Sequence, residues 1–321
     1  MTRANKWFLY GPFVAAALLL LLWFVIWRSG ASAMREALAG FAASEAAVGG
    51  AVAHSPLRAK GFPFFLRGEI GAVSIARGRY GFEADAVYLH ASPFAPRRLV
   101  FSTSPTFRLT TPDGVWQVKA DAARASFEAV DGGWIFKVEA AMADGVKEAD
   151  AIHFGRSVIN VASGAQDGAQ NGAQNGAPDG DSHAVSFRIL DARIATPRGA
   201  ADIARLDAAL SIAPTRRAAV VHGFDAEIGN ARARLSGALS VDPDGFLSGR
   251  LDAAIDNPET LASVLTMAGA VDTDDEPSLQ AGLAILSSAG GGTIAAPLDF
   301  SNGEVKLAGV NIARAPKLSQ P

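Results

Sequence analysis

The densest group of residues that could bind a cation is acidic and lies near the C-terminal end. It contains Asp272, Asp274, Asp275 and Glu276. Carboxylate oxygens are the ligands that hard cations such as Ca²⁺ prefer, so a cation site is one hypothesis for this cluster. The other is a solvated connector whose acidic residues favour the N-terminus of a helix that begins near Pro277. The connector is the simpler interpretation, and we adopt it.

Patterns for metal binding and covalent catalysis are otherwise missing from the sequence. The chain has no Cys, which excludes disulfides, Cys nucleophiles, iron–sulfur clusters and Cys-type zinc sites. It also lacks G-x-S-x-G, H-E-x-x-H, Walker A and S-x-x-K motifs. We therefore predict no catalytic residue, no metal and no cofactor. The five His are scattered without metal-ligand spacing: His54, His90, His153, His183 and His222.

One nucleotide-binding pattern occurs in the wrong context. Residues 290–295 read G-G-G-T-I-A, which formally fits G-x-G-x-x-A. The dinucleotide fingerprint needs a strand, a turn and then a helix, whereas this segment follows a predicted helix and opens a predicted strand. We interpret the glycines as a helix stop.

The aromatic residues offer a different chemistry, which is the binding of apolar molecules. Phe accounts for 18 of the aromatic residues, against 5 Trp and 3 Tyr. Because Phe has no polar group, it belongs in cores or in apolar clefts. A plain core is one interpretation, and a face that binds acyl chains is the other. The candidate residues for an apolar ligand face are Phe62, Phe64, Trp116, Trp134 and Phe136.

Alternating patterns predict the strands that hold most of these aromatic residues. Apolar and polar residues alternate around Trp116 and again from Trp134 to Val138, with the turn sequence Asp131-Gly132-Gly133 between them. An earlier run around Phe107 precedes Trp116. We expect a three-stranded meander with one apolar and one polar face.

The second half of the chain is predicted to be β-rich as well. The first expected strand covers 220–228, with His222 on its apolar face, where a structural histidine is the simpler interpretation. Two helices are expected near 257–270 and 277–289, the first with Asn257 as N-cap. The other expected strands are 231–241, 246–255, 294–300 and 305–312.

A low-complexity segment separates the two β-rich halves. From Gly164 the sequence repeats Gly-Ala-Gln-Asn/Asp with a period of four and has nothing to bury, so we predict a flexible linker or loop. Calcium-binding glycine-rich repeats have a nine-residue period and regular aspartates, which this segment lacks. The expected organisation is an anchor at 1–33, a first half at 34–162, the linker at 163–183 and a second half at 184–321.

The N-terminus carries an apolar run that could cross a membrane. Residues 7–27 contain no charge and form a helix about 30 Å long, the thickness of the hydrocarbon core. Trp residues lie near both ends of the run, as in an aromatic belt. A cleaved signal peptide is the alternative, because residues 31–33 resemble a cleavage site, but the run is long for a signal. A short Ala-rich helix is expected at 33–48.

The charge balance argues against nucleic-acid binding. Lys plus Arg total 29 and Asp plus Glu total 32, so the net charge is -3. A chain without a basic excess has little with which to neutralise phosphates. The expected partners are instead a membrane, through 7–27, and lipid.

Two stretches resemble a known bacterial family. Lys60-Gly61-Phe62-Pro63-Phe64-Phe65-Leu66 follows the N-terminal helix by some thirty residues, and Pro297 to Leu307 with Ala315 to Leu318 fits the end of the family. Together they resemble domain of unknown function 2125, with Phe65 in place of a basic residue. The resemblance implies an exported protein anchored in the inner membrane, without an established activity.

A second resemblance concerns the general plan of the chain. The segment Asn257-Pro258-Glu259 after a glycine-punctuated hairpin is similar to AsmA-like envelope proteins. Those proteins have one N-terminal anchor and long β-sheets curved around an apolar groove that carries lipid. This likeness concerns the plan of the fold and does not by itself establish function.

These observations predict a mainly β, α+β chain: one N-terminal transmembrane helix, a curved antiparallel sheet in the periplasm and a few short helices. The function expected is non-enzymatic, the binding of lipid along an apolar sheet face. Two alternatives stay open. One is a structural or interaction partner of other envelope proteins without a ligand. The other is a hydrolase with an unrecognised site, which a carboxylate close to His90 or His153 would favour.

Overall fold

The computed structural model describes residues 4–92, 95–163, 182–213, 215, 217–267, 271, 273–274 and 276–315. The chain forms two compact units, Met1–Val115 and Trp116–Pro321, and each is described by itself. Among its described residues, the first unit contains one helix and six strands: α1 (Ala4–Ala47), β1 (Gly50–Ala53), β2 (Arg58–Lys60), β3 (Leu66–Arg77), β4 (Tyr80–Ser92), β5 (Ala95–Thr103) and β6 (Thr106–Thr111).

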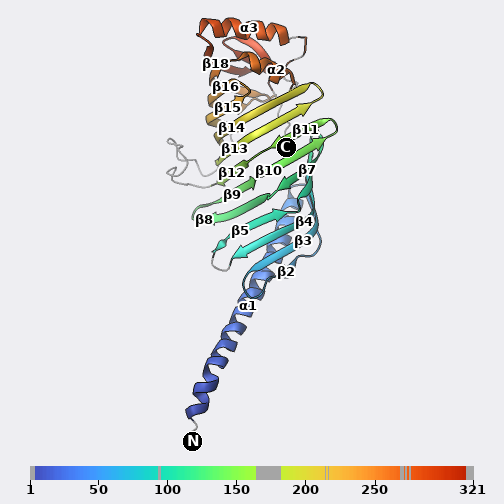
Figure 1. The fold of residues 1–321 in the computed structure, drawn as a ribbon, viewed down its shortest axis with the longest axis vertical. Helices are drawn as coiled ribbons and strands as arrows, with labels where there is room; N and C mark the ends of the chain where they lie inside the picture. Colours follow the sequence, from blue (N-terminus) through green and yellow to red (C-terminus); the bar gives the residue numbers. More distant parts are fainter. Residues whose placement is uncertain are drawn as a thin grey trace. The chain divides into compact units, whose positions relative to one another are not determined.

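Helix α1 is a single uninterrupted helix (Figure 1). The sequence analysis expected two helices, at 7–27 and 33–48, but no residue between them stops the helix, and it continues to Ala47. Gly49 then adopts a positive φ, as expected at a helix C-terminus. The later turns of α1 pack on the first unit's sheet, where Ala31 and Met34 join Leu57 and Leu66 in the core.

The first unit's strands form an antiparallel arrangement around β3 and β4. Strands β1 and β2 pair with opposite ends of β3, and β3 pairs with β4 along nearly its whole length. Strands β5 and β6 both pair with β4. The segment between β2 and β3 contains the Gly-Phe-Pro-Phe motif. The motif forms a turn, in which Pro63 has no N–H to donate, and β3 begins at Leu66, so Phe64 lies outside any strand.

The second unit contains fourteen strands and two helices within the described residues. They are β7 (Gly114–Asp121), which begins at the boundary, β8 (Arg124–Val130), β9 (Gly133–Ala140), β10 (Met142–Lys147), β11 (Asp150–Phe154), β12 (Ser157–Ser163), β13 (His183–Thr196), β14 (Gly199–Ala213), β15 (Ala218–Ile228), β16 (Ala231–Val241), β17 (Leu247–Asp256), α2 (Glu259–Met267), α3 (Glu276–Ala289), β18 (Thr293–Ser301), β19 (Glu304–Leu307) and β20 (Val310–Arg314).

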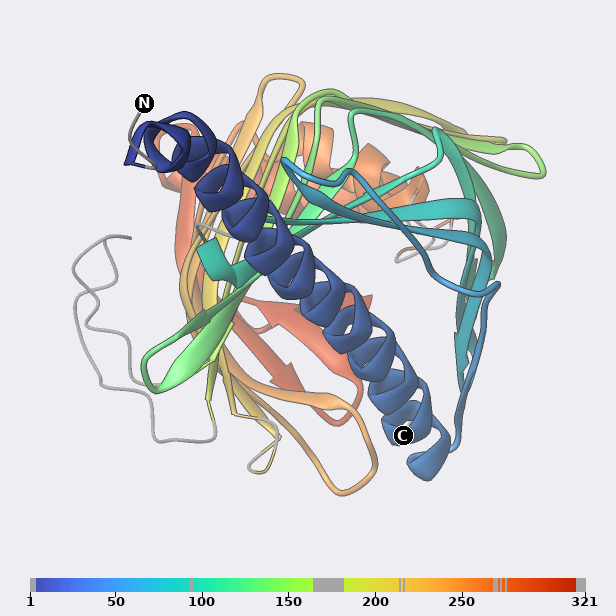
Figure 2. The same ribbon diagram turned by 90° about the horizontal axis from the view of Figure 1, so that it is seen from below.

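Every strand pairing with a register in this unit is antiparallel. One series runs β8–β9–β12–β13–β14–β15–β16–β17–β18–β19–β20, and a second runs β7–β10–β11–β13. The long strands β13 to β16 bend along their length (Figure 2). The sequence therefore predicted the fold class correctly: the chain is mainly β, with one long apolar N-terminal helix and antiparallel sheet.

Several local expectations needed correction. Strand β8 was not expected, and the Asp131-Gly132 turn joins it to β9 instead of joining the run at Trp116 to the run at Trp134. The last expected strand, 305–312, is two strands, because Ala308 and Gly309 both have positive φ and reverse the chain between them.

The two expected helices lie close to their expected positions. Helix α2 covers Glu259–Met267 and α3 covers Glu276–Ala289, while 268–270 lie outside the described residues. The side-chain N–H of Asn257, expected as an N-cap, donates to the carbonyl of Asn230, 2.9 Å away. This bond connects the start of α2 to the turn between β15 and β16.

The expected boundary at 163–183 differs from the division into compact units. That division falls between Val115 and Trp116. Strands β12 and β13, on either side of the glycine-rich segment, pair in register from Ser157 opposite Ile189 to Ser163 opposite His183, so both belong to one sheet. The predicted linker at 164–181 lies outside the described residues.

Candidate functional site

Register places an apolar row across five neighbouring strands of the second unit. Residues directly opposite one another in antiparallel strands share a face of the sheet. Phe127 of β8 lies opposite Phe136 of β9, which lies opposite Val161 of β12, and the row continues through Val185 to Leu210. None of these side chains carries a charge.

The next row on the same face, through Val138, has the same character. Val138, Ile159, Phe187 and Ala208 lie opposite one another across β9, β12, β13 and β14. We call the apolar surface on β8, β9, β12 and β13 the open apolar face. Its members are Phe127, Trp134, Phe136, Val138, Ile159, Val161, Val185, Phe187 and Ile189.

The same face is covered at the other end of the sheet. Helix α2 contacts β14 and β16, and α3 contacts β18. Beneath them Leu251, Ile255, Ile294 and Leu307 form a core with Leu283 of α3. On β8, β9 and β12, by contrast, no residue is buried, and Phe127 and Ile159 are 37% and 41% exposed. The open apolar face is therefore an extension of the core that lacks the covering helices.

Trp134 lies at one edge of the open apolar face, between two rings. Its ring stacks on Phe127 at a centroid distance of 6.1 Å and meets His183 at 5.8 Å. Within the part of the chain that the structure describes, Nδ1 of His183 is buried and has no hydrogen-bond partner. A polar group beside Trp134 would therefore find one potential partner at the end of an otherwise apolar surface.

The sequence-selected aromatic residues divide into three groups. Trp134 and Phe136 lie together on the open apolar face. Trp116 lies on β7, away from them, and the ammonium group of Lys147 sits 5.1 Å from its ring. Phe62 and Phe64 belong to the first unit, in the turn between β2 and β3, and not to a sheet face as expected. Sequence reasoning missed Ile159 and Phe187, whose place on the face depends on cross-strand register.

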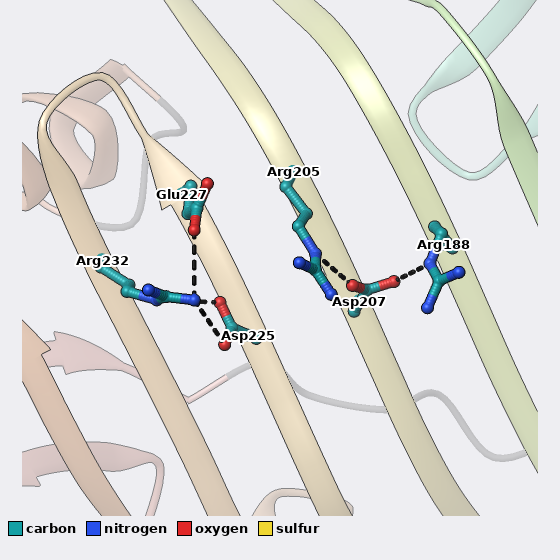
Figure 3. Close-up of polar contacts among 6 residues, drawn as sticks. All are labelled: Arg188, Arg205, Asp207, Asp225, Glu227 and Arg232. Atoms are coloured by element: carbon teal, nitrogen blue, oxygen red, sulfur yellow. Dashed lines mark hydrogen bonds and ion pairs between the residues drawn. The ribbon is translucent and has the colours of Figure 1, made fainter. Parts of the chain in front are cut away.

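The opposite face of the sheet carries paired charges. Asp207 of β14 accepts from Nε of Arg188 at 2.6 Å and also from Arg205 (Figure 3). One strand further, Arg232 contacts Asp225 at 3.3 Å and Glu227 at 3.2 Å (Figure 3). Cross-strand pairs of this kind are typical of a solvated sheet face.

The electrostatics of Asp207 follow from this position. Partial burial on its own would raise the pKa of the carboxyl, but the hydrogen bonds from Arg188 and Arg205 outweigh it and lower the pKa below the ordinary 3.8. The carboxylate is thus held charged by two guanidinium groups. It is a structural anion and not a proton donor at neutral pH.

Of the second unit's histidines, all within the described residues, only His183 contacts a member of the open apolar face. The expectation that His222 lies on the apolar face of its strand is wrong, because a bulge between Val221 and Phe224 shifts the alternation. Val221 and Phe224 both lie on the apolar side, and His222 bonds to Ser211 at 2.8 Å on the other. This places His222 in a structural hydrogen bond.

One carboxylate does lie close to a histidine, as the hydrolase hypothesis requires. Nδ1 of His153 lies 2.6 Å from Oδ1 of Asp144 on the neighbouring strand β10. By register, Lys119 lies opposite Asp144 and Arg193 lies opposite His153. The pair is therefore part of a row of charged residues across these strands. Both side chains are largely exposed, and no nucleophile accompanies them among their described hydrogen bonds.

The acidic cluster is described only in part. Asp272 and Asp275 lie outside the described residues. Glu276 accepts hydrogen bonds from Ser263 at 2.9 Å and from Gln280 at 3.1 Å, which fastens α3 to α2. Within the ranges that the structure describes, no three His, Asp or Glu side chains form a group that could hold a metal ion. The glycines at 290–292 end α3 and lead into β18, as a helix stop does.

These features define a class: a mainly β chain that combines a long apolar helix with a sheet of one apolar and one charged face. The chain belongs to the family described as "Uncharacterized protein conserved in bacteria (DUF2125)", whose model matches residues 27–316. This confirms the family resemblance seen in the Gly-Phe-Pro-Phe motif. No curated protein and no solved structure matches the chain.

Proposed function

We propose that this protein is a non-enzymatic, single-pass inner-membrane protein that binds lipid acyl chains along the open apolar face in the periplasm. Two lines of argument support the proposal, one for the anchor and one for the ligand. The observation on which lipid binding depends is that no residue is buried on β8, β9 and β12, although the same face of the sheet forms a core elsewhere.

The anchor argument begins with the composition of α1. It is one helix, long and apolar enough to cross a membrane. A cleaved signal passes the same test. Cleavage after Ala33, however, would remove Ala31, which is 2% exposed in the first unit's core, together with Trp27 packed against it. A segment that completes the core of the folded unit is better explained as a retained anchor.

The ligand argument rests on the chemistry of the open apolar face. Its nine side chains cross four neighbouring strands and carry no charge, and the indole of Trp134 is the one polar group among them. Ser157 and Ser163 lie opposite Ile189 and Trp134, at the two ends of this surface. Contiguous exposed apolar surface of this kind marks a binding site. Acyl chains match it because they need apolar contact and no directed hydrogen bonds. The resemblance to AsmA-like envelope proteins points the same way, from sequence pattern alone.

The test compares two substitutions on the same strand. Trp134→Asp places a charge on the open apolar face, while Ile135→Asp places one on the opposite face of β9. Full-length protein is purified with each substitution, and retained phospholipid per chain is measured by mass spectrometry of organic extracts. We expect Trp134→Asp to lose phospholipid while staying folded by circular dichroism, and Ile135→Asp to keep it. Lipid held by α1 is common to all samples, so the difference isolates the sheet.

Two results would contradict the proposal. Unfolding of Trp134→Asp, with Ile135→Asp folded, would make the face a plain core. Equal phospholipid in all folded samples would show that the open apolar face does not bind the phospholipid. It would favour the second candidate, an interaction surface for other envelope proteins. Crosslinking of the folded protein would then be the next experiment.

A further inference from the structure

The turn between β2 and β3 exposes three phenylalanines within five residues. We call residues 61–65 the 61–65 loop. Phe62, Phe64 and Phe65 are 42%, 81% and 51% exposed. Single exposed apolar residues are common on soluble proteins, but three on one short turn make a patch that needs a partner.

The 61–65 loop is hydrogen-bonded to α1. The indole N–H of Trp23 donates to the carbonyl oxygen of Pro63. The indole N–H of Trp27, one helical turn further, donates to the carbonyl oxygen of Phe65 at 3.0 Å. These bonds fix the height of the loop along the helix.

Ring contacts set the same height. The ring of Phe62 meets Phe24 edge-on at a centroid distance of 5.5 Å and Trp27 at 5.9 Å. The uncharged run 7–27 has its middle at Ala17, and the seven residues from there to Phe24 correspond to about 10 Å along a helix. Half of the hydrocarbon core is about 15 Å. If α1 spans a bilayer centred on that run, the loop lies at the level of the outer acyl chains.

The backbone of the 61–65 loop suits an environment without water. The N–H groups of Phe64 and Phe65 both donate to the carbonyl of Gly61 at 3.1 Å. Pro63 has no N–H, and its carbonyl accepts from Trp23. Backbone polar groups at membrane depth must be satisfied within the protein. These bonds satisfy the N–H groups of Phe64 and Phe65 and the carbonyls of Gly61, Pro63 and Phe65.

Basic residues flank the aromatic tip. Arg58 and Lys60 lie on β2, and Arg67 lies opposite Lys60 on β3. The one acidic residue in this strand pairing is Glu69, which forms an ion pair with Lys60 at 2.6 Å. Basic side chains next to inserted aromatic residues favour a surface of anionic headgroups.

We propose that the 61–65 loop is a second membrane contact, which inserts Phe62, Phe64 and Phe65 into the leaflet beside α1. The partner is a lipid bilayer with anionic headgroups. The inference rests on the proposed anchoring by α1 and adds to it: two points of insertion restrict the first unit's tilt against the membrane, which one helix alone leaves free.

The experiment uses the absence of native cysteine. Full-length protein with Phe64→Cys, Leu20→Cys or Tyr80→Cys is labelled with an environment-sensitive fluorophore and reconstituted in vesicles of phosphatidylcholine with a minority of phosphatidylglycerol. Leu20 reports a position close to Ala17, the middle of the uncharged run 7–27. Tyr80 is the matched control, because it is 61% exposed but lies on β4 opposite Arg77, at the far end of β3 and about 36 Å from the loop. Lipids spin-labelled near the headgroup or near the acyl terminus measure depth by quenching.

We expect the Phe64 probe to be quenched most by the shallow spin label, the Leu20 probe by the deep label, and the Tyr80 probe by neither. A Leu20 probe quenched by lipid beside an unquenched Phe64 probe would overturn the inference and leave the anchor intact. A blue-shifted Phe64 probe without lipid quenching would place the loop against protein and also overturn it. An unquenched Leu20 probe would overturn the anchoring itself.

Discussion

The two ends of the second unit's sheet share strand pairing and alternation but differ in what covers their apolar side. At the C-terminal end, α2 and α3 cover β16 to β18, and Leu251, Ala253 and Ile255 on β17 are all buried. Toward β8, the same side presents half-exposed rings and branched side chains. Because both ends alternate apolar and polar residues, the apolar side extends along the whole sheet. Among the described residues of this unit, covering helices lie at one end only.

The largest effect should come from the covered end. Leu251→Ala removes a side chain that is 4% exposed beneath the helices, and we expect a loss of about 3 kcal/mol in the free energy of unfolding, from transfer and cavity terms together. Urea denaturation measures it. A loss below about 1 kcal/mol would mean that the covered end is not a packed core.

A matched substitution at the open end should cost less. Ile159→Ala removes a side chain of similar size that remains 41% exposed, so we expect about 1 kcal/mol. The comparison becomes sharper when lipid is present, because ligand bound to the folded state adds stability. Added phospholipid should raise the melting temperature of the wild-type chain more than that of Ile159→Ala. Equal shifts in melting temperature would contradict lipid binding at the open end of the sheet.

The charged side should contribute the smallest effect. Asp207→Asn weakens two ion pairs on a solvated face, and we expect a loss below about 1 kcal/mol. Asp202→Asn is the control on the same strand, because Asp202 is 76% exposed and 3.7 Å from Arg193, and it should change nothing measurable. A loss from Asp207→Asn comparable to Leu251→Ala would make the ion pairs the main support of the sheet.

Lowering the pH should remove the stabilisation that Asp207 contributes, and the direction of its pKa shift fixes the pH range in which this happens. The folded pKa of Asp207 is lowered below 3.8, so its stabilisation is complete above that pH and disappears as the pH falls through the lower, folded value. Wild-type stability should therefore decrease with acid in this window more steeply than that of Asp207→Asn. Urea unfolding at a series of pH values measures both slopes, and parallel curves would contradict the assigned role of Arg188 and Arg205.

Local patterns predicted the parts of the fold that depend on neighbouring residues in the sequence. The alternation around Trp134 located β9, and the spacing of Leu residues located α2 and α3. The patterns failed where a local exception decided the outcome: a bulge near His222, a turn at Ala308-Gly309, and a proline turn that removed Phe64 from any strand. Most of the open apolar face could not be predicted, because Ile159 lies beside Val138, and Phe187 beside Ile159, only through register between strands distant in sequence.

The central claim is that acyl chains contact the open apolar face as well as α1. The most direct measurement is photocrosslinking of the full-length protein in membranes that contain a phospholipid with a photoreactive acyl chain, followed by mapping of the modified peptides by mass spectrometry. Peptides from α1 provide the internal positive control. We predict additional adducts on peptides from β8 and β9 and from β12 and β13, and their loss in Trp134→Asp. Adducts restricted to α1 and the 61–65 loop would contradict lipid binding by the sheet.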